Sequence, residues 1–194
     1  MAGDVKTRLA GVLGLEAAAG LHAGLVRHAL ATAVECGVGP VELWCAPDAT
    51  HAFFQRCARE FGATLRTQQG ADLGERMRNA FQDALSQDHA LVLIGSDCPA
   101  LVAEDLRAAA AAVRACDVAI APAEDGGYVL VAMSAMHPIF EGIAWGGAAV
   151  MRETRRRLEA VGASWRELPG SWDVDRPEDY ARLRREGLLA EVLS

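Results

Sequence analysis

Two short acidic segments, far apart in the sequence, could bind a metal ion together. Asp97 lies in Gly95-Ser96-Asp97-Cys98-Pro99, directly after the apolar run 91–94, and Asp173 and Asp175 lie far downstream. Such a run is typical of a buried parallel strand, and open α/β sheets bind ligands at the carboxyl ends of their strands. Carboxylate oxygens and a substrate phosphate are usual ligands of Mg²⁺. The two segments therefore indicate a metal and phosphate site.

Each acidic segment also has a plainer structural interpretation. Asp97 could cap the helix that we expect from residue 104. Asp173 and Asp175 precede the helix expected at 177, where the helix dipole favours carboxylates. Residues two apart in an extended segment point to opposite faces, so we expect only one of this pair to touch the ion unless the backbone bends. Cys98 is a poor candidate nucleophile, because the neighbouring carboxylate raises the pKa of its thiol.

The basic segment Lys6-Thr7-Arg8 could bind the phosphates. Lysine offers a point charge, arginine a fork of donors and threonine a hydroxyl. Lys6 is the single lysine among 19 lysine and arginine residues, which favours a position where a compact ammonium is needed. The alternatives are chance and an ordinary solvated chain end.

Two loops have the backbone freedom that a bound nucleotide requires. Asp125-Gly126-Gly127-Tyr128 joins two expected strands, and paired glycines permit positive φ and close approach to a ligand. The polar loop 68–74 leads into a helix, so its amides could bind an anion or the edge of a base. A plain turn and an exposed polar loop are the respective alternatives.

Strands and helices alternate along the chain and must position these segments. We expect strands at 41–46, 63–67, 91–94, 117–121, 128–133 and 164–168. We expect helices at 15–34, 50–61, 72–85, 104–113, 147–161 and 177–185. This alternation predicts an α/β fold, with a mostly parallel sheet between two layers of helices. The length of 194 residues, without repeats or linkers, predicts one domain over residues 1–194.

The composition argues against several functional classes. The net charge of −7 disfavours a nucleic-acid partner, which needs a basic surface. No apolar stretch has the length of a membrane span. The five cysteines include no C-x-x-C pair, and the five histidines show no metal-ligand spacing, so neither a disulfide scaffold nor a zinc site is expected. We therefore expect a cytoplasmic protein, whose oligomeric state the sequence leaves open.

The ordered motifs of the chain resemble those of the DUF2064 family. The matching segments are 5–9, 70–77, 95–99, 125–128, Trp145-Gly146 and 173–179. This family belongs to the nucleotide-diphospho-sugar transferase superfamily and is related to 2-phospholactate guanylyltransferase. The resemblance implies a three-layer glycosyltransferase A (Rossmann-like) fold with a mostly parallel mixed sheet.

The resemblance also implies roles for individual residues. Lys6 and Arg8 correspond to the phosphate-binding signature, and with Asp97 they would form the catalytic group. Asp97, Asp173 and Asp175 would hold Mg²⁺ or Mn²⁺. The residues implied to bind the nucleotide or the second substrate are Thr7, Gln69, Gly70, Asp72, Gly126, Gly127, Tyr128 and Trp145.

The activity implied is a metal-dependent transferase that uses a nucleotide-activated donor and a small-molecule acceptor. Glycosyl transfer from a nucleotide sugar is the first hypothesis. Nucleotidyl transfer of the guanylyltransferase kind, to a small phosphorylated or carboxylated acceptor, is the second. A non-catalytic nucleotide-binding protein is the third.

The chain departs from the family pattern in two places, and the first of them motivates that third hypothesis. Family members usually begin with a further strand, which lies in the middle of the sheet, whereas only residues 1–5 precede the Lys-Thr-Arg motif here. We therefore expect a fold without the usual first strand, through either a chain start placed too late or a truncation that impairs activity. Gly147 also replaces the serine or threonine expected after Trp145-Gly146, which weakens the start of the helix.

Overall fold

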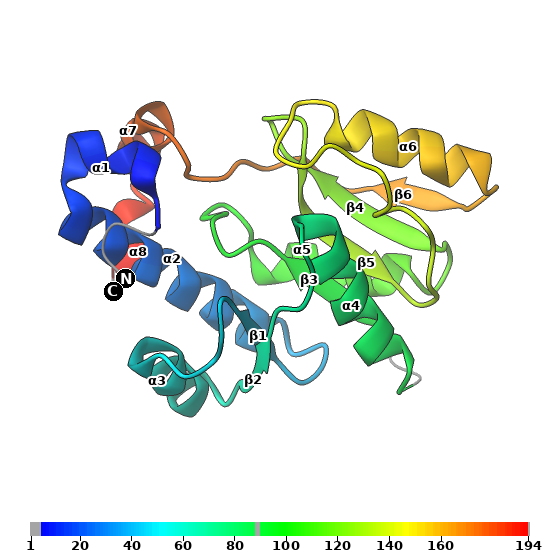
Figure 1. Ribbon diagram of the computed structural model, residues 1–194, viewed down its shortest axis with the longest axis horizontal. Helices are drawn as coiled ribbons and strands as arrows, with labels where there is room; N and C mark the ends of the chain where they lie inside the picture. Colours follow the sequence, from blue (N-terminus) through cyan, green and yellow to red (C-terminus); the bar gives the residue numbers. More distant parts are fainter. Residues whose placement is uncertain (1–4, 88–89, 194) are drawn as a thin grey trace.

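A computed structural model describes residues 5–87 and 90–193 of the chain. Its helices are α1 (Thr7–Leu13), α2 (Leu15–Cys36), α3 (Ala52–Phe61), α4 (Leu73–Leu85), α5 (Ala103–Ala112), α6 (Val150–Ala160), α7 (Pro177–Arg185) and α8 (Leu189–Leu193). Its strands are β1 (Glu42–Cys45), β2 (Thr64–Thr67), β3 (Leu91–Ile94), β4 (Val118–Pro122), β5 (Tyr128–Met133) and β6 (Trp165–Glu167). These elements form an α/β fold of helices around mixed sheets (Figure 1).

The core lies on both faces of β4 and β5. Val118 and Ile120 of β4 pack with residues of α4 and α6, including Phe81 and Leu158. The alternate residues of β4 face a second cluster, with the alanine-rich helix α5. Small side chains on α5 let the helix approach the sheet closely, as its sequence predicts. The central strands are therefore covered by helices on both faces, in three layers.

The strands divide into two sheets within the described residues. β1 pairs with β2 in parallel, while the larger sheet has the order β3-β5-β4-β6. β4 and β6 are parallel, but β5 runs antiparallel to both β3 and β4. No pairing between the two sheets is present among the described strands.

The expectation of a buried parallel strand at 91–94 was wrong in two respects. β3 pairs only with the antiparallel β5 among the described strands, and all its residues are half-buried rather than buried. A short apolar run is equally compatible with an edge strand, because its composition does not specify its neighbours. The position of Asp97 just past the end of β3 is as predicted.

The helices at the two ends of the chain pack together. Leu9 of α1, Leu21 and Leu25 of α2, Leu183 of α7 and Val192 of α8 form one buried cluster. In Figure 1 the segment after β6 returns across the molecule to reach α7, beside α1. This return brings the segment 172–176 to the beginning of the described chain. Neither α1 nor α8 was predicted from the sequence.

The remaining elements agree with the sequence predictions to within a few residues. β5 and α7 have the predicted bounds, and α6 begins at Val150 without a side-chain cap. The expectation that the usual first strand is absent concerns the start of the chain, where residues 1–4 lie outside the described residues. None of the described helices combines the length and apolar character needed to cross a membrane.

Candidate functional site

Lys6 joins three segments that are remote in the sequence. Its ammonium lies 2.7 Å from Asp97 Oδ2 and donates a hydrogen bond to the carbonyl of Val174. The side chain is only 5% exposed. Its backbone has φ of 49°, the one positive value among described residues other than glycine, and such left-handed conformations carry strain. The structure thus brings together the basic motif and both acidic motifs.

Asp97 is held from several sides. Its backbone carbonyl accepts a hydrogen bond from the N–H of Val174 at 2.9 Å. Its Oδ1 lies 3.5 Å from Nδ1 of His22, a residue of α2. Burial raises the pKa of the Asp97 carboxyl, but the contact with His22 and the charge of Lys6 outweigh it, so the pKa lies below its ordinary value. Asp97 is therefore ionised at neutral pH.

The pKa of Asp173 is shifted in the opposite direction, above its ordinary value. Burial raises the pKa of its carboxyl, and the charge of Asp125 raises it further. The attraction of Lys6 is too small to reverse this, and Asp97 adds to the repulsion. The site therefore contains more negative than positive charge. Asp125, which the sequence analysis left out of the candidate residues, contributes to that excess.

Asp175 has a different partner from Asp97. It forms an ion pair with Arg8 of α1, whose side chain is 64% exposed. Thr7 beside it is also exposed. Over residues 5–87 and 90–193, no three His, Cys, Asp or Glu side chains group closely enough to hold a metal ion. The assignment of Asp97, Asp173 and Asp175 as metal ligands remains a prediction.

Cys98 is buried and has the environment of an inert thiol. Burial is the main cause that raises the pKa of the Cys98 thiol, and the charges of Asp173 and Asp97 raise it further. The thiolate is the reactive form of cysteine. Cys98 is therefore not available as a nucleophile at neutral pH, as the sequence predicted.

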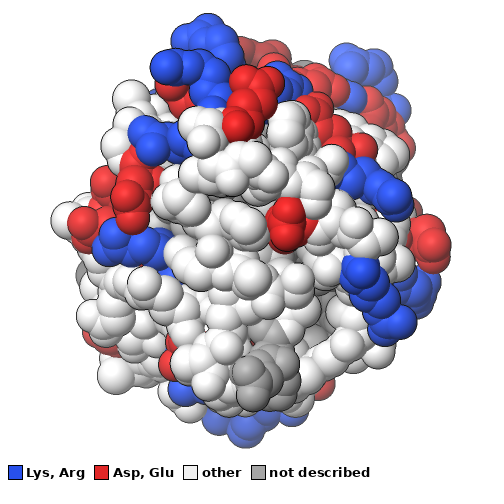
Figure 2. Space-filling model, turned by 90° about the vertical axis from the view of Figure 1, so that its right-hand side faces the viewer, with Lys and Arg blue, Asp and Glu red and all other residues white. Residues whose placement is uncertain are grey.

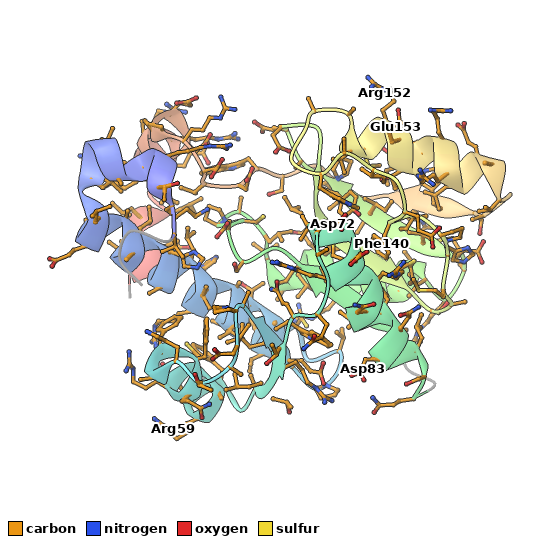
Figure 3. The ribbon with its side chains drawn as sticks, in the orientation of Figure 1. Arg59, Asp72, Asp83, Phe140, Arg152 and Glu153 are labelled. Carbon is orange, nitrogen blue, oxygen red and sulfur yellow. The ribbon has the colours of Figure 1, made fainter. Side chains whose placement is uncertain are left out.

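The loop before α4 ends in a helix cap. Asp72 Oδ1 accepts a hydrogen bond from the N–H of Glu75 at 2.8 Å, and the Glu75 carboxylate accepts one from the N–H of Ala71 at 2.8 Å. Figure 3 shows Asp72 at the start of α4, near Phe140. Asp72 thus caps the start of α4 through Oδ1.

The backbone of Gln69 and Gly70, which precede this cap, is held by side chains of α4. Asn79 donates a hydrogen bond to the carbonyl of Gln69 at 2.8 Å, and Arg76 donates one to the carbonyl of Gly70 at 3.3 Å. Within the described part of the chain, the side-chain amide of Gln69 has no recorded partner. The loop is therefore preformed, with one amide group free to contact a ligand.

The glycine loop 125–128 is tightly packed rather than open. Gly126 has φ of 95°, and a Cβ there would lie 2.3 Å from the carbonyl oxygen of Ala148. The N–H of Gly127 donates to Asp125 Oδ1 at 2.9 Å. Only glycine fits position 126 without moving the segment before α6. The loop thus fixes Asp125 and its charge near Asp173.

Tyr128 and Trp145 contact one another. Their rings meet edge to face with centroids 6.2 Å apart, and a Cβ on Gly74 would lie 2.2 Å from Trp145 Nε1. Burial raises the pKa of the Tyr128 hydroxyl. These contacts connect the glycine loop to the start of α4, and a role of the two aromatic residues in binding a nucleotide remains a prediction.

Comparison with known proteins identifies the family. Residues 29–147 match the family described as "Uncharacterized protein conserved in bacteria (DUF2064)". The chain belongs to this family. The match includes the motifs of Asp72, Asp97, Asp125 and Trp145, while the motifs of Lys6 and Asp173 lie on either side of it. No curated protein matches the chain.

A solved structure supports the DUF2064 assignment and the fold over nearly the whole chain. It is a crystal structure of a "putative nucleotide-diphospho-sugar transferase" from Desulfovibrio desulfuricans, with a TM-score of 0.83 and 29% sequence identity. The alignment covers 99% of this chain and 93% of that chain. The fold is therefore that of a nucleotide-diphospho-sugar transferase, of the glycosyltransferase A type.

Proposed function

We propose that this DUF2064 protein is a metal-dependent transferase that transfers a glycosyl group from a nucleotide sugar to a small-molecule acceptor. The observation that carries the proposal is the buried ammonium of Lys6, which lies between Asp97 and the segment 173–175 at the end of β3. In open α/β sheets ligands bind beyond the carboxyl ends of strands, and Asp97 follows the carboxyl end of β3. The similarity to a solved protein described as such a transferase supports the same reading.

The donor set suits a hard cation shared with phosphates. Mg²⁺ is usually held by one or two carboxylates and by substrate phosphates. Asp97 Oδ1 is buried without a hydrogen-bond partner among the described residues, and the raised pKa of Asp173 reflects uncompensated negative charge. Asp97 and Asp173 would therefore hold Mg²⁺ or Mn²⁺, whereas Asp175 would first have to leave Arg8. The bound cation would neutralise charge on the leaving phosphates.

Lys6 and Arg8 would contribute in different ways. The ammonium of Lys6 is fixed before any ligand binds, which suits electrostatic stabilisation of a leaving group without reorganisation. Arg8 is exposed, and surface ion pairs such as Arg8–Asp175 are weak. Its guanidinium can therefore exchange the carboxylate for a phosphate, which it would bind through two donors. Gln69, in the preformed loop, would contact the nucleotide.

Binding measurements with Mn²⁺ and a panel of UDP-sugars, GDP-sugars and nucleoside triphosphates test the proposal. We expect one donor to raise the melting temperature of the wild-type protein only when Mn²⁺ is present, and Asp97→Asn to remove that gain. Asp83→Asn is the matched control, because it makes the same chemical change outside the candidate site. Asp83 lies at the opposite end of α4 from Asp72, which is one of the candidate site residues (Figure 3). If no donor stabilises the protein, the non-catalytic alternative is favoured.

Product analysis then separates the two kinds of transfer. Glycosyl transfer releases a nucleoside diphosphate from a nucleotide sugar. Nucleotidyl transfer releases pyrophosphate from a nucleoside triphosphate. Incubation of the stabilising donor with a set of small hydroxylated, phosphorylated and carboxylated acceptors should yield the nucleoside diphosphate, and the appearance of pyrophosphate would refute the glycosyltransferase proposal.

A further inference from the structure

His22 of α2 faces the buried oxygen of Asp97. The Nδ1 atom of His22 and the Oδ1 atom of Asp97 are 3.5 Å apart, and both atoms are buried. Neither has another hydrogen-bond partner among the described residues. A buried polar atom without a partner destabilises the fold. Each of the two atoms therefore offers the other the partner that it lacks.

The two oxygens of Asp97 then have separate partners. Oδ2 contacts the ammonium of Lys6 at 2.7 Å, and Oδ1 faces the imidazole of His22. A carboxylate held at both oxygens has a fixed rotation about its terminal bond. The direction in which it offers its remaining lone pairs is fixed as well.

We propose that His22 is a positioning residue, which orients the Asp97 carboxylate through an Nδ1–H···Oδ1 hydrogen bond for cation and donor binding. This inference rests on the proposed function of Asp97 as a cation ligand. Hydrogen-bond partners of ligating groups usually set their orientation, and removing one commonly lowers metal affinity about 10–100-fold. His22 acts through Asp97 and touches no ligand itself.

The surroundings of His22 support this role. Leu21 and Leu25, its neighbours on α2, are buried in the cluster that packs α1, α7 and α8 together, so the helix cannot move freely away from the loop. Farther along the same helix, Nε2 of His28 lies 3.1 Å from the carbonyl of Pro99. Two imidazoles of one helix thus contact the 95–99 loop, but only His22 contacts the carboxylate.

This difference provides matched variants. His22→Ala removes the donor to Asp97, His22→Asn keeps a side-chain N–H at similar reach, and His28→Ala removes only a contact to the loop backbone. Calorimetric titration with MnCl₂ alone measures cation affinity. We expect His22→Ala to weaken it about tenfold or more, His22→Asn to restore most of it, and His28→Ala to change it less than twofold.

A second measurement without any ligand tests the contact itself. In a double-mutant cycle of His22→Ala and Asp97→Ala, each of which removes one partner of the contact, the double variant should lose less stability to urea than the sum of the single variants. Additive losses would overturn the inference, as would unchanged Mn²⁺ affinity in His22→Ala or equal weakening in His28→Ala. Failure of the wild-type protein to bind Mn²⁺ would instead overturn the proposed function, on which this inference depends.

Discussion

The carboxylates around Lys6 differ in how far their charge is compensated. Asp97 has an ammonium and an imidazole beside it, and its pKa lies below the ordinary value. Asp173 lies close enough to Asp125 and Asp97 to feel their charges, and its pKa lies above the ordinary value. The same site thus contains one well-paired carboxylate and one that is repelled by its neighbours. Such uneven compensation is common where a cation or proton is to be bound.

This difference predicts opposite effects of two isosteric substitutions. In wild type, the Asp173 charge destabilises the fold above its raised pKa, and this penalty disappears at acid pH, where folded and unfolded chains are both protonated. Asp173→Asn should therefore raise the melting temperature at pH 7 by up to about 4 °C, roughly 1 kcal/mol for a chain of this length. The gain should shrink as pH falls through the raised pKa towards about 4.

Asp97→Asn provides the comparison. The stability that ionised Asp97 contributes is present above its unfolded pKa of about 3.9 and is lost as pH falls through its lower folded pKa. This variant should therefore melt below wild type at pH 7, with a difference that narrows only in stronger acid. Melting curves between pH 3 and 8, at fixed ionic strength and without divalent cations, measure both profiles. Parallel profiles for the two variants would contradict the charge distribution described for the site.

Among the helices and strands, the sequence predicted most accurately those whose ends are set by local turn or cap residues. The bounds of β5 and α7 follow from a glycine turn before Tyr128 and from Pro177 at the first helical position. The pairing of β3 was not predictable, because four apolar residues fit both a central strand and an edge strand. The first helix was missed, since it is only seven residues long and contains Gly11, a poor helix former.

In the candidate site, too, the residues in local motifs were predicted and those brought in by packing were not. The motifs of Lys6, Asp97 and Asp173 were recognisable from their residues and their order, and the structure brings these motifs together. His22 and Asp125 were missed as site residues, because their approach to Asp97 and Asp173 depends on how α2 and the glycine loop pack. No spacing in the sequence encodes those contacts.

The contact between α4 and Trp145 gives a prediction at this scale. Alanine is intrinsically better than glycine inside a helix by about 1 kcal/mol, but a Cβ at Gly74 would lie 2.2 Å from Trp145 Nε1 and 2.7 Å from the Phe140 carbonyl oxygen. Gly74→Ala should therefore destabilise the protein by about 1–3 kcal/mol, as overpacking does. Urea denaturation measures the change.

Gly20 of α2 is the matched control. It is exposed, and a Cβ there would meet nothing within 4 Å. Gly20→Ala should stabilise the protein by about 0.5–1 kcal/mol. If Gly74→Ala stabilised the protein as Gly20→Ala is expected to, Trp145 would not be held against α4 as described.

The whole molecule combines regions with very different burial. β4 and β5 lie between two layers of helices, and residues 118–121 and 129–133 are at most 4% exposed. The β1–β2 pair is separate from the larger sheet, and most of its residues are half-buried. Charged side chains on the face seen in Figure 2 lie mainly around its rim, with both signs interspersed. That face therefore has no basic patch among its described residues, as the net charge of −7 suggests.

This contrast predicts unequal resistance to local opening. Amide hydrogens of β4 and β5 should exchange with solvent most slowly, because opening them exposes the core on both faces of the sheet. Those of β1 and β2 should exchange about 100-fold faster or more, since their sheet has two strands and only partial cover. Hydrogen exchange followed by mass spectrometry on peptides spanning 42–67 and 118–133 measures both rates. Equal protection would mean that the two sheets open as one cooperative unit.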